Sequence, residues 1–278
     1  MGLKAPIVSF GKHTAAGPEG PGDLGLTWVT IDDPGNIDDI HGAGYGGVDY
    51  TFRIMKYAVR ESDIDAYNAD PANASLQITL ADRGDDKPAT NVSWNKAARY
   101  VNWLNTREGF PVAYQFDTGG VNDNIALWDP GDPGYDVNNR YRSSIAEYFL
   151  PSEDEWYKAA YYNGSIYYDY ATGSDTAPTA VASGTTAGTA VYDGQSGPAD
   201  VDQAGGLSPY GTMGQGGNTY EWNESAYDGT NDSTTESRVL RGGFWNYDSA
   251  ALQSSFRSSF SPGFGFSDFG FRVAAVPE

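Results

Sequence analysis

Alternating apolar and polar side chains predict two strands near the start of the chain. Residues 26–31, LTWVTI, alternate over a short run, and residues 48–59, VDYTFRIMKYAV, alternate over a longer one. A period of two is typical of a strand with one buried face. In the longer run that face carries Val48, Tyr50, Phe52 and Ile54. An acidic, glycine-rich loop at 32–47 joins the two predicted strands.

Helical spacing predicts two helices in the first half of the chain. Ser62 and the acids after it are typical of a capping box, which opens a short helix ending near Ala69. Ser93 precedes a stronger pattern, in which five apolar residues share one face: Trp94, Ala97, Ala98, Val101 and Leu104. We interpret the tryptophans of this helix as core residues rather than ligand contacts.

A third helix is predicted after Leu150, in the run LPSEDEWYKAA. Ser152 and Glu155 are spaced to cap each other's backbone, and acids in a first turn suit the helix dipole. Glu153 and Glu155 are therefore interpreted as capping acids rather than as a catalytic carboxylate pair. The segments on either side, 106–144 and 174–206, are long, polar and without a helical period.

The C-terminal stretch from 210 to 273 combines glycine pairs with aromatic strands. Its motifs are GNTYEW at 217–222, RVLRGGFW at 238–245 and GFR at 270–272. In this order, together with LPSEDEW, they resemble the formylglycine-generating enzyme family, also called the sulfatase-modifying factor domain. The resemblance implies an α+β, C-type-lectin-like fold with short antiparallel strands and two or three helices. We expect a flexible segment at 1–25, one domain at 26–274 and the start of a tail at 275–278.

The formal net charge of −20 argues against a nucleic-acid partner, because phosphate contacts need clustered Lys and Arg. No apolar run approaches the roughly 18 residues of a membrane span. The final Val-Pro-Glu resembles the start of a bacterial PEP-CTERM sorting tail. We therefore expect a secreted or cell-surface protein whose leader and sorting signal are absent from this sequence.

The sequence contains no cysteine. In the resembled family two active-site cysteines bind copper, and their positions correspond to Tyr247 and Leu252 here. Neither side chain can replace a thiolate, so formylglycine generation and copper are excluded. The sulfoxide-forming branch of the fold uses a histidine triad with iron. This chain has two histidines, His13 and His41, so such a site is not expected either.

Calcium is the cofactor that the resemblance implies, in a structural role. The corresponding ligands are the carboxylate of Glu221 and main-chain carbonyls of Gly217 and Thr219. Calcium favours such mixed oxygen sets. A fourth family ligand falls at Gly214, which has no side chain, so this site would have lost one oxygen.

We expect ligands to bind the segment that follows the second glycine pair. It mixes aromatic rings with small polar residues, the chemistry that binder paratopes use. The expected surface is Tyr247, Asp248, Ser255, Phe256, Arg257, Ser259, Phe260, Phe264, Phe266 and Asp268.

The sequence thus favours a non-catalytic binding or structural protein whose ligand is an unidentified protein, peptide or glycan. One alternative is a cysteine-free tailoring enzyme acting on a small molecule or peptide. Another is a variable binding protein diversified by a retroelement, since that process also produces Phe, Tyr, Ser, Asp, Asn and Gly. An enzyme should show a deep pocket converging on titratable groups near Asp248, Arg257 and Glu221, and a binding protein a shallow aromatic face.

Overall fold

The computed structural model describes residues 25–40 and 44–277. Three helices and ten short strands are assigned there, which confirms the α+β prediction. The helices are α1 (Glu61–Ala69), α2 (Trp94–Arg107) and α3 (Glu153–Tyr161). The strands are β1 (Trp28–Ile31), β2 (Phe52–Met55), β3 (Tyr148–Phe149), β4 (Thr179–Ala180), β5 (Thr189–Ala190), β6 (Tyr220–Ala226), β7 (Arg238–Arg241), β8 (Ser258–Phe260), β9 (Phe269–Phe271) and β10 (Ala274–Ala275).

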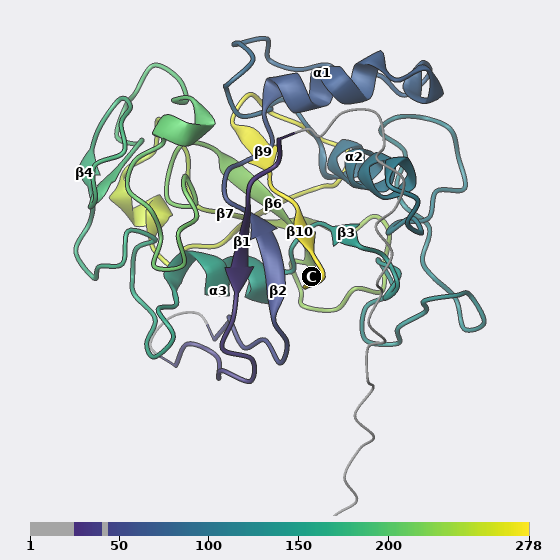
Figure 1. The fold of residues 1–278 in the computed structure, drawn as a ribbon, viewed down its shortest axis with the longest axis horizontal. Helices are drawn as coiled ribbons and strands as arrows, with labels where there is room; N and C mark the ends of the chain where they lie inside the picture. The colour runs from purple at the N-terminus through teal and green to yellow at the C-terminus, as the bar shows by residue number, and fades with distance from the viewer. Residues whose placement is uncertain (1–24, 41–43, 278) are drawn as a thin grey trace, which may run out of the picture.

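Two four-stranded sheets organise the described residues, in the orders β1-β2-β10-β3 and β8-β7-β6-β9. Most neighbouring strands are antiparallel, as predicted. β6 and β9 are parallel, with Tyr220 opposite Phe269, and the small β4–β5 pair is parallel too. β9 continues through two residues into β10, so one segment belongs to both sheets. In Figure 1 this segment is yellow, α1 lies above it, α2 lies to its right, and β4 lies at the far left.

Arg272 lies at the joint between the sheets, between β9 and β10, and is fully buried. Its Nε and Nη2 donate to the two carboxylate oxygens of Glu221 on β6, at 2.6 and 2.7 Å. Its remaining N–H groups donate to the carbonyls of Met55, Lys56 and Met213 at 2.9–3.1 Å. All five guanidinium donors are therefore satisfied, the condition under which a buried charge is tolerated.

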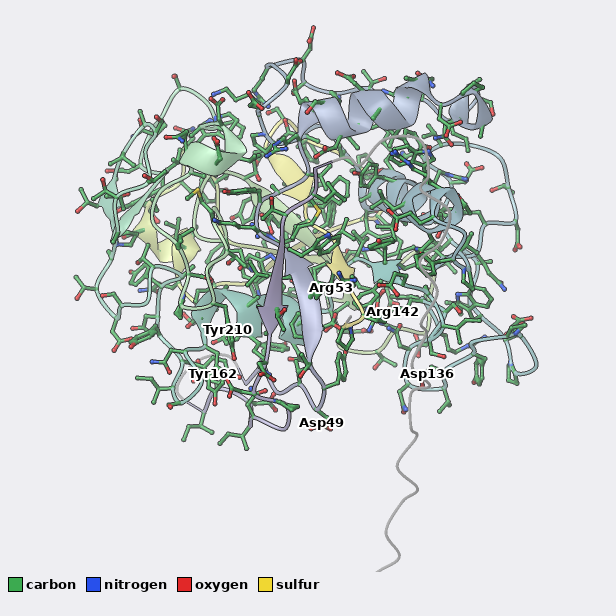
Figure 2. All side chains as sticks on the ribbon, viewed as in Figure 1. Asp49, Arg53, Asp136, Arg142, Tyr162 and Tyr210 are labelled. Atoms are coloured by element: carbon green, nitrogen blue, oxygen red, sulfur yellow. The ribbon has the colours of Figure 1, made fainter. Side chains whose placement is uncertain are left out.

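The core confirms the predicted role of the α2 tryptophans. Trp94 is fully buried and donates from Nε1 to the carbonyl of Asn223 on β6, at 2.9 Å. Trp222 on β6 donates in return to the carbonyl of Val92, just before α2, also at 2.9 Å. The predicted cap is present, because Ser93 Oγ accepts from the N–H of Lys96. Side chains fill the space between the elements (Figure 2).

The boundaries of two predicted elements are wrong. The strand expected over 48–59 forms only at Phe52–Met55, because its antiparallel partner β1 is four residues long. The carbonyls of Met55 and Lys56 accept from Arg272. The first helix is not capped by Ser62: its N-cap lies two residues earlier, at Arg60, whose N–H donates to Asp63 at 2.8 Å.

Replacing Arg272 with methionine should destabilise the whole fold, because Glu221 would stay buried without a counter-charge. We expect the free energy of unfolding to fall by about 3–5 kcal/mol, measured by urea denaturation. Arg140→Gln is the matched control, because its partner Asp129 has a largely exposed side chain, at 72%, and such pairs contribute only about 0–1 kcal/mol. Equal losses in the two variants would contradict the role assigned to Arg272.

Candidate functional site

A turn built from two glycine pairs leads into the predicted binding segment. Gly217 donates its N–H to the carbonyl of Gly242 at 2.7 Å, which brings the two motifs together. Gly242 has φ +95°, and a Cβ there would lie 2.6 Å from the Gln215 carbonyl oxygen. Glycine is required because any side chain would be strained and would meet main chain. Beyond this turn the chain passes from buried Trp245 to exposed Tyr247.

Aromatic rings form a continuous row from this turn to the loop after β8. Tyr247 contacts Phe244 at 4.4 Å between ring centroids, and both contact Tyr220 on β6. Tyr220 meets Phe269 at 6.1 Å in an edge-to-face arrangement. Phe269 in turn contacts Phe260 and Phe266, and Phe260 contacts Phe264 at 5.7 Å. Such edge contacts are favourable beyond the area that they bury.

Four rings of the row are open to solvent, and we call them the aromatic surface. The exposed fractions are 45% for Tyr247, 38% for Phe260, 57% for Phe264 and 42% for Phe266. The rings between them, Tyr220 and Phe269, are buried and hold the exposed ones in place. Clustered exposed phenylalanines leave apolar area in water, so such patches often mark interaction sites.

The loop that carries Phe264 and Phe266 is held by residues far away in the sequence. Asn122 donates from Nδ2 to the carbonyl of Gly263 at 2.5 Å, and Asn91 donates its N–H to the carbonyl of Phe266 at 2.8 Å. Arg83 donates to the carbonyl of Ser267 at 2.9 Å and lies over the Trp245 ring. These three contacts were not predicted from the sequence. The residues that make them lie in loops whose only recognisable feature in the sequence is their length.

The other predicted surface residues serve several purposes. Asp248 caps the 3-10 turn Ser249–Leu252 by accepting the N–H of Ala250, and Phe256 packs partly against the core. Asp268 is half-buried, and that burial raises its pKa, whereas the charge of Arg83 lowers it. Ser255 is exposed, and Ser259 is half-buried in β8, opposite Val239.

Arg257 lies apart from the aromatic surface, in a charged cluster beside α3. Its guanidinium makes a two-point contact with Glu153 at 2.7–3.0 Å and is flanked by the rings of Tyr45 and Tyr227. Arg241 of the RGG motif binds the same carboxylate. Glu153 therefore holds two arginines. Glu155 and Ser152 cap each other as predicted, with N···O distances of 2.6 and 3.1 Å.

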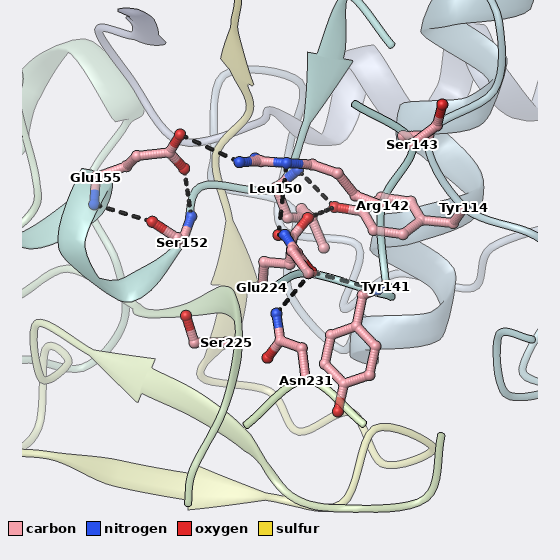
Figure 3. A network of polar contacts seen from close by, with 12 residues as sticks. Tyr114, Tyr141, Arg142, Ser143, Leu150, Ser152, Glu155, Glu224, Ser225 and Asn231 are labelled. Carbon is pink, nitrogen blue, oxygen red and sulfur yellow. Dashed lines mark hydrogen bonds and ion pairs between the residues drawn. The ribbon is translucent and has the colours of Figure 1, made fainter. Parts of the chain in front are cut away.

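A buried polar network also links Glu155 to Glu224 on β6 (Figure 3). Arg142 lies between the two carboxylates, 3.5 Å from Glu155 and 3.7 Å from Glu224. Tyr114 donates its hydroxyl to Glu224 at 2.7 Å. Burial raises the pKa of Glu224, and the charge of Arg142 opposes this. Both carboxylates are fully buried, so a substrate could not reach them without a rearrangement of the core.

Two hollows in the described part of the chain are lined by residues other than those of the aromatic surface. A crevice of about 10 Å³ lies between the start of β1 and α1, and an open hollow of about 500 Å³ is lined by residues of 117–125 and Thr234. Neither is lined by a residue of the predicted surface. Leu252, at one of the family's cysteine positions, is buried, whereas Tyr247 at the other is exposed. His13 and His41 lie outside the described residues.

Glu221, the carboxylate predicted to bind calcium, is already engaged by other side chains. Both oxygens of Glu221 accept from Arg272, and Oε2 also accepts from Trp156 Nε1 at 2.7 Å. Within residues 25–40 and 44–277, no group of three or more His, Cys, Asp or Glu is placed to hold a metal. With Glu221 engaged in this way, calcium binding there is disfavoured and needs a direct test.

Comparison with known proteins places the chain in a structural context. Residues 48–276 match the family model described as "Sulfatase-modifying factor enzyme 1-like domain". No curated protein matches the sequence. No helix within the described ranges is long and apolar enough to cross a membrane.

Three solved structures are similar over nearly the whole chain. CarF is 24% identical with a TM-score of 0.65, covering 92% of this chain and 100% of its own. Treponema denticola variable protein 1 is 21% identical with a TM-score of 0.64, covering 91% and 95%. PvdO from Pseudomonas aeruginosa is 19% identical with a TM-score of 0.52, covering 91% and 92%. Together with the family match they confirm the C-type-lectin-like fold of the formylglycine-generating-enzyme subclass.

The state of Glu221 leads to a prediction about calcium. Because Arg272 and Trp156 already use both of its oxygens, we expect a chelator such as EGTA to leave the thermal unfolding midpoint unchanged. A midpoint that fell in EGTA and recovered on adding calcium would instead support a cation at Glu221.

Asp154, in the first turn of α3, generates a prediction about pH. Burial raises its pKa to about 6; the N–H of Gly46 opposes the shift, and the charges of Asp38, Glu153 and Glu155 add to it. A carboxyl with a raised folded pKa destabilises the fold above that pH, and the penalty fades as the pH falls toward 4. Asp154→Asn should therefore stabilise the protein by ~2 kcal/mol at pH 7.5 and by less at pH 4.5.

Urea denaturation of both proteins at each pH measures this difference. Asp65→Asn, at an exposed position of α1, is the control for loss of a carboxylate. An Asp154→Asn effect of equal size at the two pH values would show that the carboxylate does not titrate as described.

Proposed function

The chain belongs to the sulfatase-modifying factor enzyme 1-like domain family, and from that premise we propose that it is a binding protein without catalytic activity. It recognises its ligand through the aromatic surface of Tyr247, Phe260, Phe264 and Phe266. The ligand is a protein, peptide or glycan rather than a nucleic acid, since the chain has a net charge of −20.

The observation that carries this proposal is that the rings are exposed to solvent although contacts with neighbouring rings hold them in place. Phe264 and Phe266 remain 57% and 42% exposed although buried Phe269 anchors their cluster. Rigid rings lose little conformational entropy on binding, which makes aromatic side chains effective anchors. An aromatic face of this kind, which lines neither hollow, supports a binding protein rather than an enzyme with a deep pocket.

The distribution of acids supports a non-catalytic role. Glu153 and Glu221 are held by arginines, and Glu224 is buried beside Arg142. Such partners suit structural carboxylates better than acid or base catalysts, which need access to a substrate. For a cysteine-free tailoring enzyme, Asp248 and half-buried Asp268 would be candidate acids, and turnover of a small molecule would support that alternative.

A second candidate is a variable binding protein, and the resemblance in fold to Treponema denticola variable protein 1 favours its consideration. Phe, Ser, Gly and Asp dominate 258–268, residues that adenine-directed mutagenesis produces. A nearby reverse-transcriptase gene with a near-identical template repeat would establish it, and its absence would remove it. In either case we propose a secreted or cell-surface location, which the acidic composition supports.

The double variant Phe264→Ser/Phe266→Ser tests the binding proposal. In a screen of peptides and glycans on the purified protein, we expect the variant to bind any recovered ligand at least about tenfold more weakly. Ile145→Ser/Ile166→Ser is the matched control, since both isoleucines are exposed and lie outside the aromatic surface. Undiminished binding by the phenylalanine variant would remove the aromatic surface as the site.

A further inference from the structure

An open polar hollow adjoins the Phe264 side of the aromatic surface. Its volume is about 500 Å³, and its lining includes Ile125 and six polar residues: Asp117, Thr118, Asn122, Asp123, Asn124 and Thr234. This size and openness suit the end of a long side chain better than an enclosed small molecule.

Two connections join the hollow to the aromatic surface. Asn122, in the lining, donates from Nδ2 to the carbonyl of Gly263, directly before Phe264. On the other side, Thr234 belongs to the segment that leads into β7, and Arg238 at the start of β7 is paired with Phe260. A ligand lying on Phe260 and Phe264 would therefore extend naturally into the hollow.

The charges that line the hollow are both negative. They belong to Asp117 and Asp123, and the other polar lining residues are amides and hydroxyls. Hydrogen bonds from Thr118 and from the N–H of Gly120 lower the pKa of Asp123, so it stays ionised at neutral pH. The charge of nearby Arg99 also lowers the pKa of Asp123, while its guanidinium donates to the Thr118 carbonyl and lies over the Phe116 ring.

Two acids beside exposed rings form a surface complementary to cations. Aromatic faces attract Lys and Arg through cation–π contacts, and carboxylates bind the same groups by charge-assisted hydrogen bonds. The net charge of −20 also favours the approach of a basic partner and disfavours an acidic one.

From this geometry we infer that the partner is a basic polypeptide segment. An apolar residue of the segment packs on Phe260 and Phe264, and a neighbouring Lys or Arg enters the hollow between Asp117 and Asp123. This inference rests on the proposed binding function and adds the class of partner and a second subsite.

A phage-displayed library of random peptides, selected on the full chain at roughly 50 mM salt, tests the inference, because charge attraction is weakly screened there. We expect the recovered peptides to combine Lys or Arg with an apolar residue. The synthetic peptides should bind Asp117→Asn/Asp123→Asn about fivefold more weakly than the wild type, and their affinity should fall as salt rises.

Asp49→Asn/Asp65→Asn is the matched control, because it changes the net charge equally at two exposed positions outside the hollow. Asp49 is labelled at the lower edge of Figure 2. Both variants should remain folded at the temperature of the binding measurement, and the control should keep its affinity within about twofold.

The outcomes separate this inference from the proposed function. If Phe264→Ser/Phe266→Ser loses binding but the hollow and control variants behave alike, the basic subsite is wrong and the aromatic surface stands. If the phenylalanine variant keeps full affinity, the proposed function itself is wrong. Recovery of neutral or acidic peptides, of no peptide, or of a glycan that binds independently of salt would overturn the basic polypeptide as partner.

Discussion

The buried ion pair of Arg272 and Glu221 is the interaction on which the arrangement of the two sheets depends. Glu221 belongs to β6 of one sheet, and Arg272 lies where β9 leaves that sheet and becomes β10 of the other. The guanidinium also binds the carbonyls at the end of β2, so one side chain contacts both sheets. A buried charge is costly unless every donor has a partner, and here each N–H has one.

The family motifs act in this chain as scaffold. The Glu of the first motif binds the Arg of the last, and Trp156 of the LPSEDEW run donates to the same carboxylate. The RGG arginine, Arg241, binds Glu153, and the glycine pairs meet through Gly217 and Gly242. The motifs thus fix backbone positions and leave the outer loop free to differ, which explains how this fold persists without cysteine.

Local signals in the sequence predicted local structure well. The caps at Ser93 and Ser152 were predictable because donor and acceptor lie three residues apart. The extent of the second strand was not, because its partner determines where it ends. Asn122 and Gly263 are 141 residues apart, so no local pattern linked the hollow to the aromatic segment. The rings at 260–266 were predicted as a surface from composition alone. Which of these rings contact one another could be known only from the folded structure.

The continuation of β9 into β10 also has a consequence for synthesis on the ribosome. β10 lies between β2 and β3, although those strands precede it by more than a hundred residues of chain. Neither sheet can therefore be completed until the segment from Phe269 to Ala275 has left the exit tunnel. β1 can pair with β2, and β7 with β6 and β8, before that segment emerges, whereas the sheet edges that β9 and β10 later cover stay open to aggregation until then.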